Sequence, residues 1–298
     1  MLDKIIQQYG LDDPYPIQYA RWLSLLLRGE WGWSPTLRAD VTQVLWARTP
    51  ATAELTLYSL LLLLPMGLWN GVMAGWKQGR LADRGFRLFA YMATSIPPFV
   101  LGLVLLSIFY VGLHWFPVGR LGITSSLDLR ASSFKTVTGL LTVDGALNGR
   151  FDISFEAVRH LVLPVITLSL AHWATLGRVT RAAMIEEINK EYVMAARAKG
   201  LPNRSVIWRH VFLNAAPPAL ASSALSAAAL VTGVFVIEAV FAFPGVSDLI
   251  VRTMGAIPDT PMAMGFAVYS VLVVSLLMFA LDVAQALINP FLRKEITA

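Results

Sequence analysis

The stretch AELTLYSLLLLLPMGLWNGVMAGW, residues 53–76, is almost wholly apolar and carries one charged residue, Glu54. A helix of roughly 20 such residues crosses the hydrocarbon core of a bilayer, which is about 30 Å thick. The stretch therefore predicts a membrane-spanning helix, Ala53–Trp76. The same criterion selects four further spans: Pro97–Phe116, His160–Arg181, Pro218–Phe241 and Met262–Leu287.

The composition agrees with this reading. Of the 298 residues, 56% are hydrophobic and 14% are charged, and the mean hydropathy is +0.61. Soluble domains are nearer half apolar and a quarter charged, so we expect an all-α polytopic membrane protein with about five spans. The chain has no cysteine, which excludes disulfides and cysteine-ligated metals. The net charge of +5 is spread over several connections and forms no patch, which argues against nucleic-acid binding.

Small residues are concentrated in the fourth span, in ALASSALSAAALVTGV, residues 219–234. Such residues let helices approach closely in a membrane. We therefore expect this span to lie against other helices and not against lipid.

The distribution of lysine and arginine predicts the orientation, because cytoplasmic loops are enriched in both. The connections Val118–Arg159 and Ala242–Pro261 mix both signs of charge. They alternate with basic segments, which places the C-terminus on the cytoplasmic side and the N-terminus outside. The basic segments carry Lys77, Arg80, Arg84 and Arg87; then Lys190, Arg197, Lys199, Arg204 and Arg209; and finally Arg293 and Lys294.

This orientation requires residues 1–52 to be extracytoplasmic or interfacial, although they do not resemble a signal peptide. Two explanations remain: an upstream span is missing from this chain, which we favour, or the segment crosses as a tail. Within it, YARWLSLLLRGEWGWS, residues 19–34, predicts a short amphipathic helix followed by Trp31 and Trp33, which suits the outer membrane boundary.

Catalytic and metal-binding motifs are not found in the sequence. The four histidines, His114, His160, His172 and His210, have no metal-ligand spacing, and there is no phosphate-binding loop and no Gly-x-Ser-x-Gly motif. A membrane-embedded hydrolase built on His172 and a serine such as Ser169 is a weak alternative. We therefore assign no catalytic, cofactor-binding or metal-binding residue.

Ionisable residues inside spans are the default functional candidates in a membrane protein. Glu54 and Arg178 lie near span ends, where we expect them to reach the interface. Glu238 and Asp282 are expected to have structural roles inside the bundle. Two isolated carboxylates give thin support for a proton-coupled secondary carrier, which is the main alternative function.

The connection between the third and fourth spans, residues 182–217, has a helical pattern of its own. Tyr192, Ala195, Ala196 and Lys199 fall at positions i, i+3, i+4 and i+7 and predict one small, flat helix face. Asn189 is the expected N-cap, Glu191 lies in the first turn, and Gly200 with Pro202 ends the helix. A second helix is expected from Asn203 through His210. The pattern fits either a helix that inserts into a cleft of another protein or a solvated interfacial loop.

The full connection, EYVMAARAKGLPNRSVIWRHVFLNAAPP at residues 191–218, resembles the cytoplasmic loop of binding-protein-dependent ABC importer permeases. It is most similar to the dipeptide/oligopeptide/nickel permease subfamily, whose loop reads acidic-Tyr-Val-x-x-Ala-Arg-Ala-Lys-Gly-Leu. In the general Glu-Ala-Ala register of the larger family, Met194 stands in the glutamate position. The matching residues are Glu191, Tyr192, Val193, Ala196, Arg197, Ala198, Lys199, Gly200, Leu201, Arg209, His210, Asn214, Ala215 and Pro218.

Other segments resemble the same subfamily in the same order, including SIPPFVLGLVLLSIFYVGLHWFPVGR at residues 95–120. IEAVFAFPGVSDLIVRTM, residues 237–254, is similar to its Glu-x-x-Phe-x-x-Pro-Gly-x-Gly-x-Leu stretch, with Ser247 where a second glycine is usual. The tail INPFLR departs from the more usual ending. The resemblance covers nearly the whole chain except the first span of the subfamily.

The resemblance implies a type I ABC importer transmembrane domain, residues 53–298, in a bacterial or archaeal cytoplasmic membrane. It implies four kinds of partner: a second, similar permease, two ATP-binding cassette subunits, a solute-binding protein outside the membrane, and lipid. ATP and Mg²⁺ would be bound by the ATPase subunits, and this chain would catalyse nothing. Peptides are the expected cargo, with nickel chelates, glutathione or oligosaccharides as alternatives. The residues implied in ATPase coupling are Glu191, Tyr192, Ala195, Ala196, Arg197, Lys199, Gly200, Arg209 and His210.

Overall fold

The structure is a computed structural model that describes residues 13–131, 133–255 and 258–288. Helices dominate the described residues, and the two short strands form one antiparallel pair. In chain order the elements are α2 (Tyr15–Leu27), β1 (Trp33–Ser34), β2 (Ala39–Asp40), α3 (Val41–Trp76), α4 (Leu81–Ser95), α5 (Pro98–Leu105), the π-helical η1 (Leu106–Gly112), α6 (Ile123–Ala131), α7 (Leu141–Leu147), α8 (Phe151–Ile188), α9 (Glu191–Ala198), α10 (Asn203–Ser205), the π-helical η2 (Val206–Val211), α11 (Phe212–Val240), α12 (Val246–Thr253) and α13 (Thr260–Ile288).

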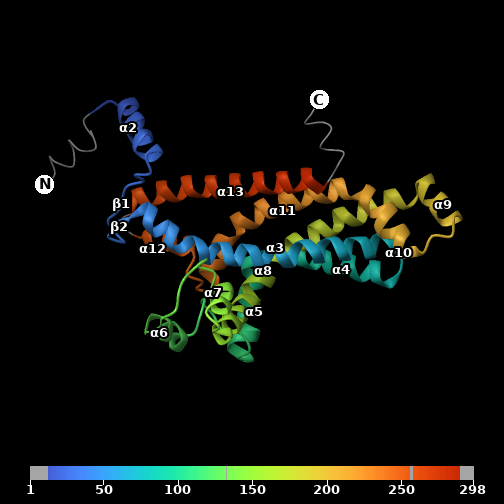
Figure 1. Cartoon of the computed structure of the whole chain (residues 1–298), viewed down its shortest axis with the longest axis horizontal. Helices are drawn as coiled ribbons and strands as arrows, with labels where there is room; N and C mark the ends of the chain where they lie inside the picture. The colour runs from blue at the N-terminus through green and yellow to red at the C-terminus, as the bar shows by residue number, and fades with distance from the viewer. Residues whose placement is uncertain (1–12, 132, 256–257, 289–298) are drawn as a thin grey trace.

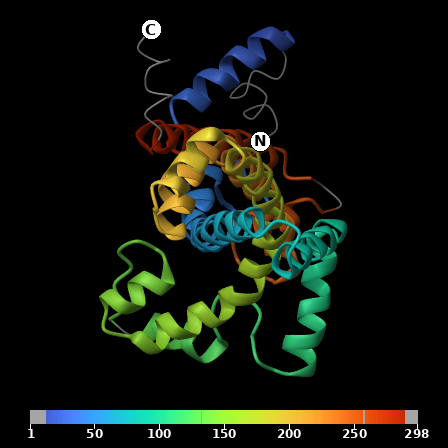
Figure 2. The ribbon, with the colours of Figure 1, turned by 90° about the vertical axis from the view of Figure 1, so that its right-hand side faces the viewer.

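The long helices α3, α8, α11 and α13, together with α4, lie alongside one another in an elongated bundle (Figure 1). One end of this bundle carries α9 and α10, and the other carries β1, β2 and α12. We refer to these as the α9 end and the α12 end. The elements α5, α6 and α7 project from the side of the bundle, as the end-on view shows (Figure 2).

Four helical stretches in the described part of the chain are long and apolar enough to cross a membrane: Val41–Trp76, Phe151–Ile188, Asn203–Val240 and Thr260–Leu281. They correspond to the predicted first, third, fourth and fifth spans. The first three begin earlier than predicted by two turns of helix or more, and the stretch from Thr260 ends six residues before the predicted Leu287. The predicted first span begins 12 residues too late, because α3 has 36 residues and starts at Val41. At 1.5 Å per residue, α3 is about 54 Å long and exceeds the hydrocarbon thickness.

The second predicted span, Pro97–Phe116, is helical over only part of its length and meets the criterion for a span only together with α4. Helix is present over the 8 residues of α5 and the 7 of η1, and this stretch meets α4 at an angle of 99°. The bend follows from the two prolines. Ile96 is extended, with φ −99° and ψ 123°, because a residue that precedes proline is disfavoured in the helical region. Pro97 lacks an N–H, so α4 ends at Ser95 and a new helix begins at Pro98.

A stripe of three glycines lets α3 pack closely against α8. Gly67, Gly71 and Gly75 are spaced four residues apart and all three are buried. They face residues of the same spacing on α8, namely Leu176, Thr180 and Met184. At Gly71 an added Cβ would lie 2.5 Å from Thr180 Cβ and 2.6 Å from the carbonyl oxygen of Gly177. The close approach of the two helices therefore requires that residue 71 has no side chain.

We expect Gly71→Ala to destabilise the bundle by about 1–3 kcal/mol, because the methyl group collides with backbone that cannot move aside. Thermal unfolding in detergent measures this as a lower midpoint. Gly85→Ala on α4 is the matched control, because no atom lies within 4 Å of its added Cβ. An equal midpoint for the two variants would show that the crossing tolerates a side chain.

The small residues of α11 face the bundle, as predicted. Ala219, Ser223, Ala224, Ser226 and Ala227 are buried. The helix packs against α8. Its larger Leu230, Val234 and Ile237 join the main apolar core with residues of α3 and α8. The prediction that this span lies against other helices is therefore confirmed.

The N-terminal segment forms the predicted short helix, α2, followed by Trp31 and the β1–β2 pair that begins at Trp33. The helix begins at Tyr15, four residues earlier than predicted, and none of its residues is buried. It lies on the outer side of α13 in Figure 2. Its position at the membrane boundary stays a prediction.

Asp259 joins this segment to the start of α13. Its carboxylate accepts hydrogen bonds from Ser34 Oγ (2.6 Å) and from the N–H groups of Thr36 (3.1 Å) and Met262 (3.1 Å). Burial alone would raise the pKa of Asp259, but these hydrogen bonds favour the carboxylate and hold the pKa below its usual value.

The depressed pKa of Asp259 predicts a pH dependence. Its stabilising effect is complete above the unfolded-state pKa of about 3.9 and is lost as pH falls through the lower folded-state pKa. We expect Asp259→Asn to lower stability at pH 7 by about 1–3 kcal/mol and to flatten the loss of stability in acid. Thermal unfolding between pH 3 and 7 measures both effects. Asp128→Asn is the control, since Asp128 is half exposed and forms a surface ion pair with Arg150.

Candidate docking site

The C-terminus of α9 has the geometry that the sequence predicts. Gly200 has a φ of +74°, in the left-handed region that favours glycine. The N–H of Leu201 donates to the carbonyl of Ala196, and the N–H of Gly200 donates to that of Arg197. This pair of bonds is a Schellman motif, which satisfies the last carbonyls of the helix. The predicted stop at Gly200 and the new helix at Asn203 are confirmed.

The N-terminus of α9 differs from the prediction. Lys190 occupies the N-cap position without a capping side chain, and Glu191 lies in the first turn as expected. Asn189 is wrong as the N-cap, because it ends α8 and its side-chain amide donates to the carbonyl of Ile185. The reason is that α8 continues to Ile188, seven residues beyond the predicted span, and only two residues separate the helices.

The inner face of α9 packs against the bundle. Val193 and Ala196 are buried in an apolar cluster with Val72, Met184 and Val206. Tyr192 Oη donates to Glu187 Oε2 (2.5 Å); burial and this carboxylate raise the pKa of Tyr192 to about 12, so the hydroxyl keeps its proton. The Arg197 guanidinium lies over the Trp76 ring, 5.1 Å from its centroid. These contacts fix α9 relative to α3 and α8.

The outer face of α9 consists of Glu191, Met194, Ala195 and Ala198, all exposed and spaced i, i+3, i+4 and i+7. The side chain of Met194 is the most prominent apolar group on it, at 59% exposure. The predicted face was therefore partly wrong: Ala195 and Lys199 are exposed, but Tyr192 is half-buried and Ala196 is buried at 5%. Because Val193 and Ala196 are both buried, the helix is rotated relative to the prediction. Met194 and Ala198 therefore lie on the exposed face in place of Tyr192 and Ala196.

Two further predicted residues lie on a different element. Arg209 and His210 belong to η2, the π-helical turn that leads into α11. Arg209 lines a groove with Trp69 of α3, and the carbonyl of His210 accepts a hydrogen bond from Asn214. Neither residue belongs to the outer face of α9.

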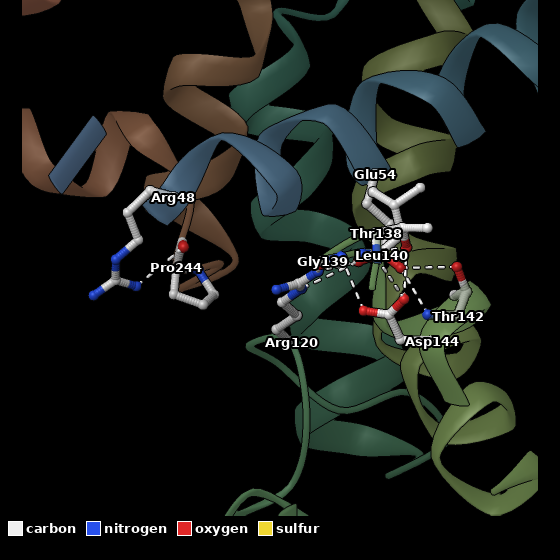
Figure 3. Close-up of polar contacts among 9 residues, drawn as sticks. All are labelled: Arg48, Glu54, Arg120, Thr138, Gly139, Leu140, Thr142, Asp144 and Pro244. Carbon is white, nitrogen blue, oxygen red and sulfur yellow. Dashed lines mark hydrogen bonds and ion pairs between the residues drawn. The ribbon is translucent and has the colours of Figure 1, made fainter. Parts of the chain in front are cut away.

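At the other end, Glu54 of α3 holds the connection that follows η1 (Figure 3). Its carboxylate is fully buried and pairs with Arg120, whose Nη2 lies at 2.7 Å. The N–H and hydroxyl of Thr142 donate to its second oxygen, both at 2.8 Å. The prediction that Glu54 reaches the interface is wrong. No local pattern in the sequence indicates this role, because Arg120 and Thr142 lie 66 and 88 residues away from Glu54.

Asp144 organises the same connection from within (Figure 3). It accepts hydrogen bonds from the N–H (2.8 Å) and hydroxyl (2.7 Å) of Thr138 and from the N–H of Gly139 (2.8 Å). Burial opposes its charge, but these donors hold the pKa of Asp144 below its usual value. The carbonyl of Gly139 in turn accepts from Arg120. The turn around Gly139 is thus fastened to α3 through Arg120 and Glu54.

The connection between α11 and α12 is fastened to the same stretch of α3. Glu238 is fully buried and accepts hydrogen bonds from Thr52 Oγ1 (2.6 Å) and the N–H of Ser247 (2.8 Å). Arg48 donates to the carbonyl of Pro244 (3.1 Å; Figure 3). A side chain at Gly245 would collide with the Glu238 carboxylate. The expected structural role of Glu238 is confirmed.

The remaining residues that the sequence singled out lie in α8 and α13. Arg178 is exposed, as expected, and the side chain of Asp282 lies outside the described part of the structure. The Ser169 hydroxyl donates to the carbonyl of Val165, and no hydrogen bond joins it to His172 among the described residues. The geometry gives no support to a hydrolase at this pair.

These features define a multi-pass helical membrane protein whose spans carry a short, rigid helix with an exposed apolar face. The family model described as "Binding-protein-dependent transport system inner membrane component" matches residues 67–294. The chain belongs to this family, and its fold is that of a type I ABC importer transmembrane domain. It is a transport component and not an enzyme.

Curated relatives match nearly the whole chain. The "Di/tripeptide transport system permease protein DppB" of Pseudomonas aeruginosa is 33% identical over 97% of this chain and 84% of its own length. The "Probable D,D-dipeptide transport system permease protein DdpB" of Escherichia coli is also 33% identical, with the same coverage. The "Oligopeptide transport system permease protein AppB" of Bacillus subtilis is 30% identical, again over 97% of this chain and 84% of that protein.

Proposed function

We propose that this chain is one permease subunit of an ATP-driven importer that carries peptides across the cytoplasmic membrane. The family supports this function, and so do the relatives, which are named as di/tripeptide and oligopeptide permeases. The structural observation that carries it is the α9 helix. Its inner face is packed into the bundle while Met194, Ala195 and Ala198 are presented outward.

The assembly that we propose contains a second permease of similar fold, two ATPase subunits that bind ATP and Mg²⁺, and a solute-binding protein outside the membrane. The α9 end and the C-terminus face the cytoplasm in this arrangement. Lysine and arginine residues support that orientation: they are frequent in the segment before α4 and in the segment from Lys190 to Arg209.

Coupling follows from the way α9 is held. Its outer face enters a cleft of an ATPase subunit, with Met194 as the largest apolar contact. Since Val193 and Ala196 are packed against Met184 of α8 and Val206 of η2, α9 moves together with those elements. Closure of the ATPase dimer on ATP therefore displaces the ends of two spans. The energy comes from the different affinity of the ATPases for ATP in the two states.

Uptake by proteoliposomes tests this function. The complex with its ATPases and binding protein is expected to accumulate labelled di- or oligopeptide only when ATP and Mg²⁺ are supplied to the ATPase side. A proton ionophore should leave uptake unchanged. Uptake that survives without the ATPases and collapses with the proton gradient would instead establish the secondary carrier. Parallel assays with glutathione, a nickel chelate and an oligosaccharide decide the cargo class.

A further inference from the structure

A groove of about 770 Å³ lies between α3 and the segment from α10 to η2. Its apolar wall includes Trp69 and Met73 of α3 and Trp208 of η2. The two indole rings are stacked at a centroid distance of 5.5 Å and an interplanar angle of 27°. Trp69 is nevertheless 55% exposed, so the stack leaves a large aromatic surface uncovered.

Two cations border the same groove. Arg204 and Arg209 line it and are exposed. Neither forms an ion pair with a carboxylate in the described part of the chain. Guanidinium groups bind phosphate oxygens through paired N–H donors. The groove thus combines an apolar aromatic wall with two cations that are free to meet an anion.

The groove lies near the end of α3 that is followed by basic residues. Trp69 lies seven residues before the end of α3 at Trp76, which corresponds to about 10 Å along the helix. The basic residue Lys77 follows directly beyond that end. Tryptophan prefers the level of lipid headgroups, and basic pockets between spans bind the phosphates of anionic lipids.

We propose that this groove binds one anionic phospholipid. Its phosphate lies between Arg204 and Arg209, and the upper part of its acyl chains lies against Trp69 and Met73. The assignment to the cytoplasmic leaflet rests on the orientation given under the proposed function, but lipid binding itself does not. A phospholipid fits better than a soluble anion because the uncovered wall is aromatic and lies at the level of the spans.

Native mass spectrometry of the delipidated full chain in detergent tests the proposal. The probes are phosphatidylglycerol, phosphatidylcholine and inorganic phosphate. The first phosphatidylglycerol is expected to bind at least tenfold more tightly than phosphatidylcholine. The double variant Arg204→Gln/Arg209→Gln is expected to lose this preference. The matched control Arg80→Gln/Arg84→Gln removes the same charge from another exposed basic segment and is expected to keep it.

Three outcomes would overturn the proposal. The first is an unchanged preference in the Arg204/Arg209 variant. The second is an equal loss in the Arg80/Arg84 control, which would show attraction to net charge and not to a site. The third is full displacement of the lipid by millimolar inorganic phosphate, which would indicate a site for a free anion. Thermal unfolding of both variants in the same detergent verifies that they are folded, and none of these outcomes depends on peptide uptake.

Discussion

Ala195→Arg on the outer face of α9 is expected to abolish ATPase association and ATP-dependent uptake while the spans stay folded. Ala195 is exposed between Met194 and Ala198, so an arginine there enlarges and charges the surface that enters the cleft. Loss of a hot-spot contact at the centre of an interface costs about 2 kcal/mol or more, which weakens binding at least roughly thirtyfold, and we expect a bulky charge at this position to have an effect of that size. Co-purification of the ATPase with the tagged permease measures the loss.

Two variants make this result specific. Ala82→Arg introduces the same change at an exposed alanine of α4 and is expected to leave association intact. Ala196→Leu acts differently, because Ala196 is 5% exposed and packs inward. It should lower the thermal midpoint as well as association. Normal association and uptake in Ala195→Arg would remove the outer face of α9 from the proposed contact.

Glu54→Ala is expected to destabilise the connection between η1 and α8 by about 3 kcal/mol. The substitution leaves Arg120, which is 19% exposed, without its carboxylate and leaves the N–H of Thr142 without an acceptor. Removing one partner of a largely buried pair costs more than the pair itself contributes, because an uncompensated charge remains. Thermal unfolding measures the global effect, and faster tryptic cleavage after the exposed Lys135 measures the local one.

The double variant Glu54→Met/Arg120→Met is the companion measurement. It removes both charges and is expected to be more stable than Glu54→Ala. Arg150→Ala provides the surface comparison, because Arg150 pairs with Asp128 and Asp152, which are 50% and 61% exposed. We expect that change to cost less than about 1 kcal/mol. Equal unfolding of wild type and Glu54→Ala would contradict the role assigned to the Glu54–Arg120 pair.

Local chemistry explains which parts of the fold were predictable. Long apolar runs are sufficient to find spans, since any helix in lipid must satisfy its own backbone, and four of the five were found this way. The end of α9 was predictable because Gly200 and Pro202 act within one turn. The bend at Pro97–Pro98 has an equally local cause, but an apolar run of span length concealed it.

Long-range contacts explain what was missed. The glycine stripe Gly67, Gly71 and Gly75 is a readable small-residue repeat, yet its partner stripe on α8 is known only from the fold. Glu54 looked like a residue at the end of a span because Arg120 and Thr142 are far away in sequence. The outer face of α9 was misassigned by one helix position, since the pattern did not show that Ala196 packs against the bundle.

The central claim is that the outer face of α9 contacts the ATPase, and site-directed cross-linking tests it most directly. The chain has no native cysteine, so an introduced thiol is the only one that it carries. Met194→Cys and Ala196→Cys place single thiols on the outer and inner faces of α9, two residues apart. In the assembled complex, a short thiol–amine cross-linker should join Met194→Cys to the ATPase subunit and leave Ala196→Cys uncoupled. Cross-linking from Ala196→Cys, with none from Met194→Cys, would contradict the account.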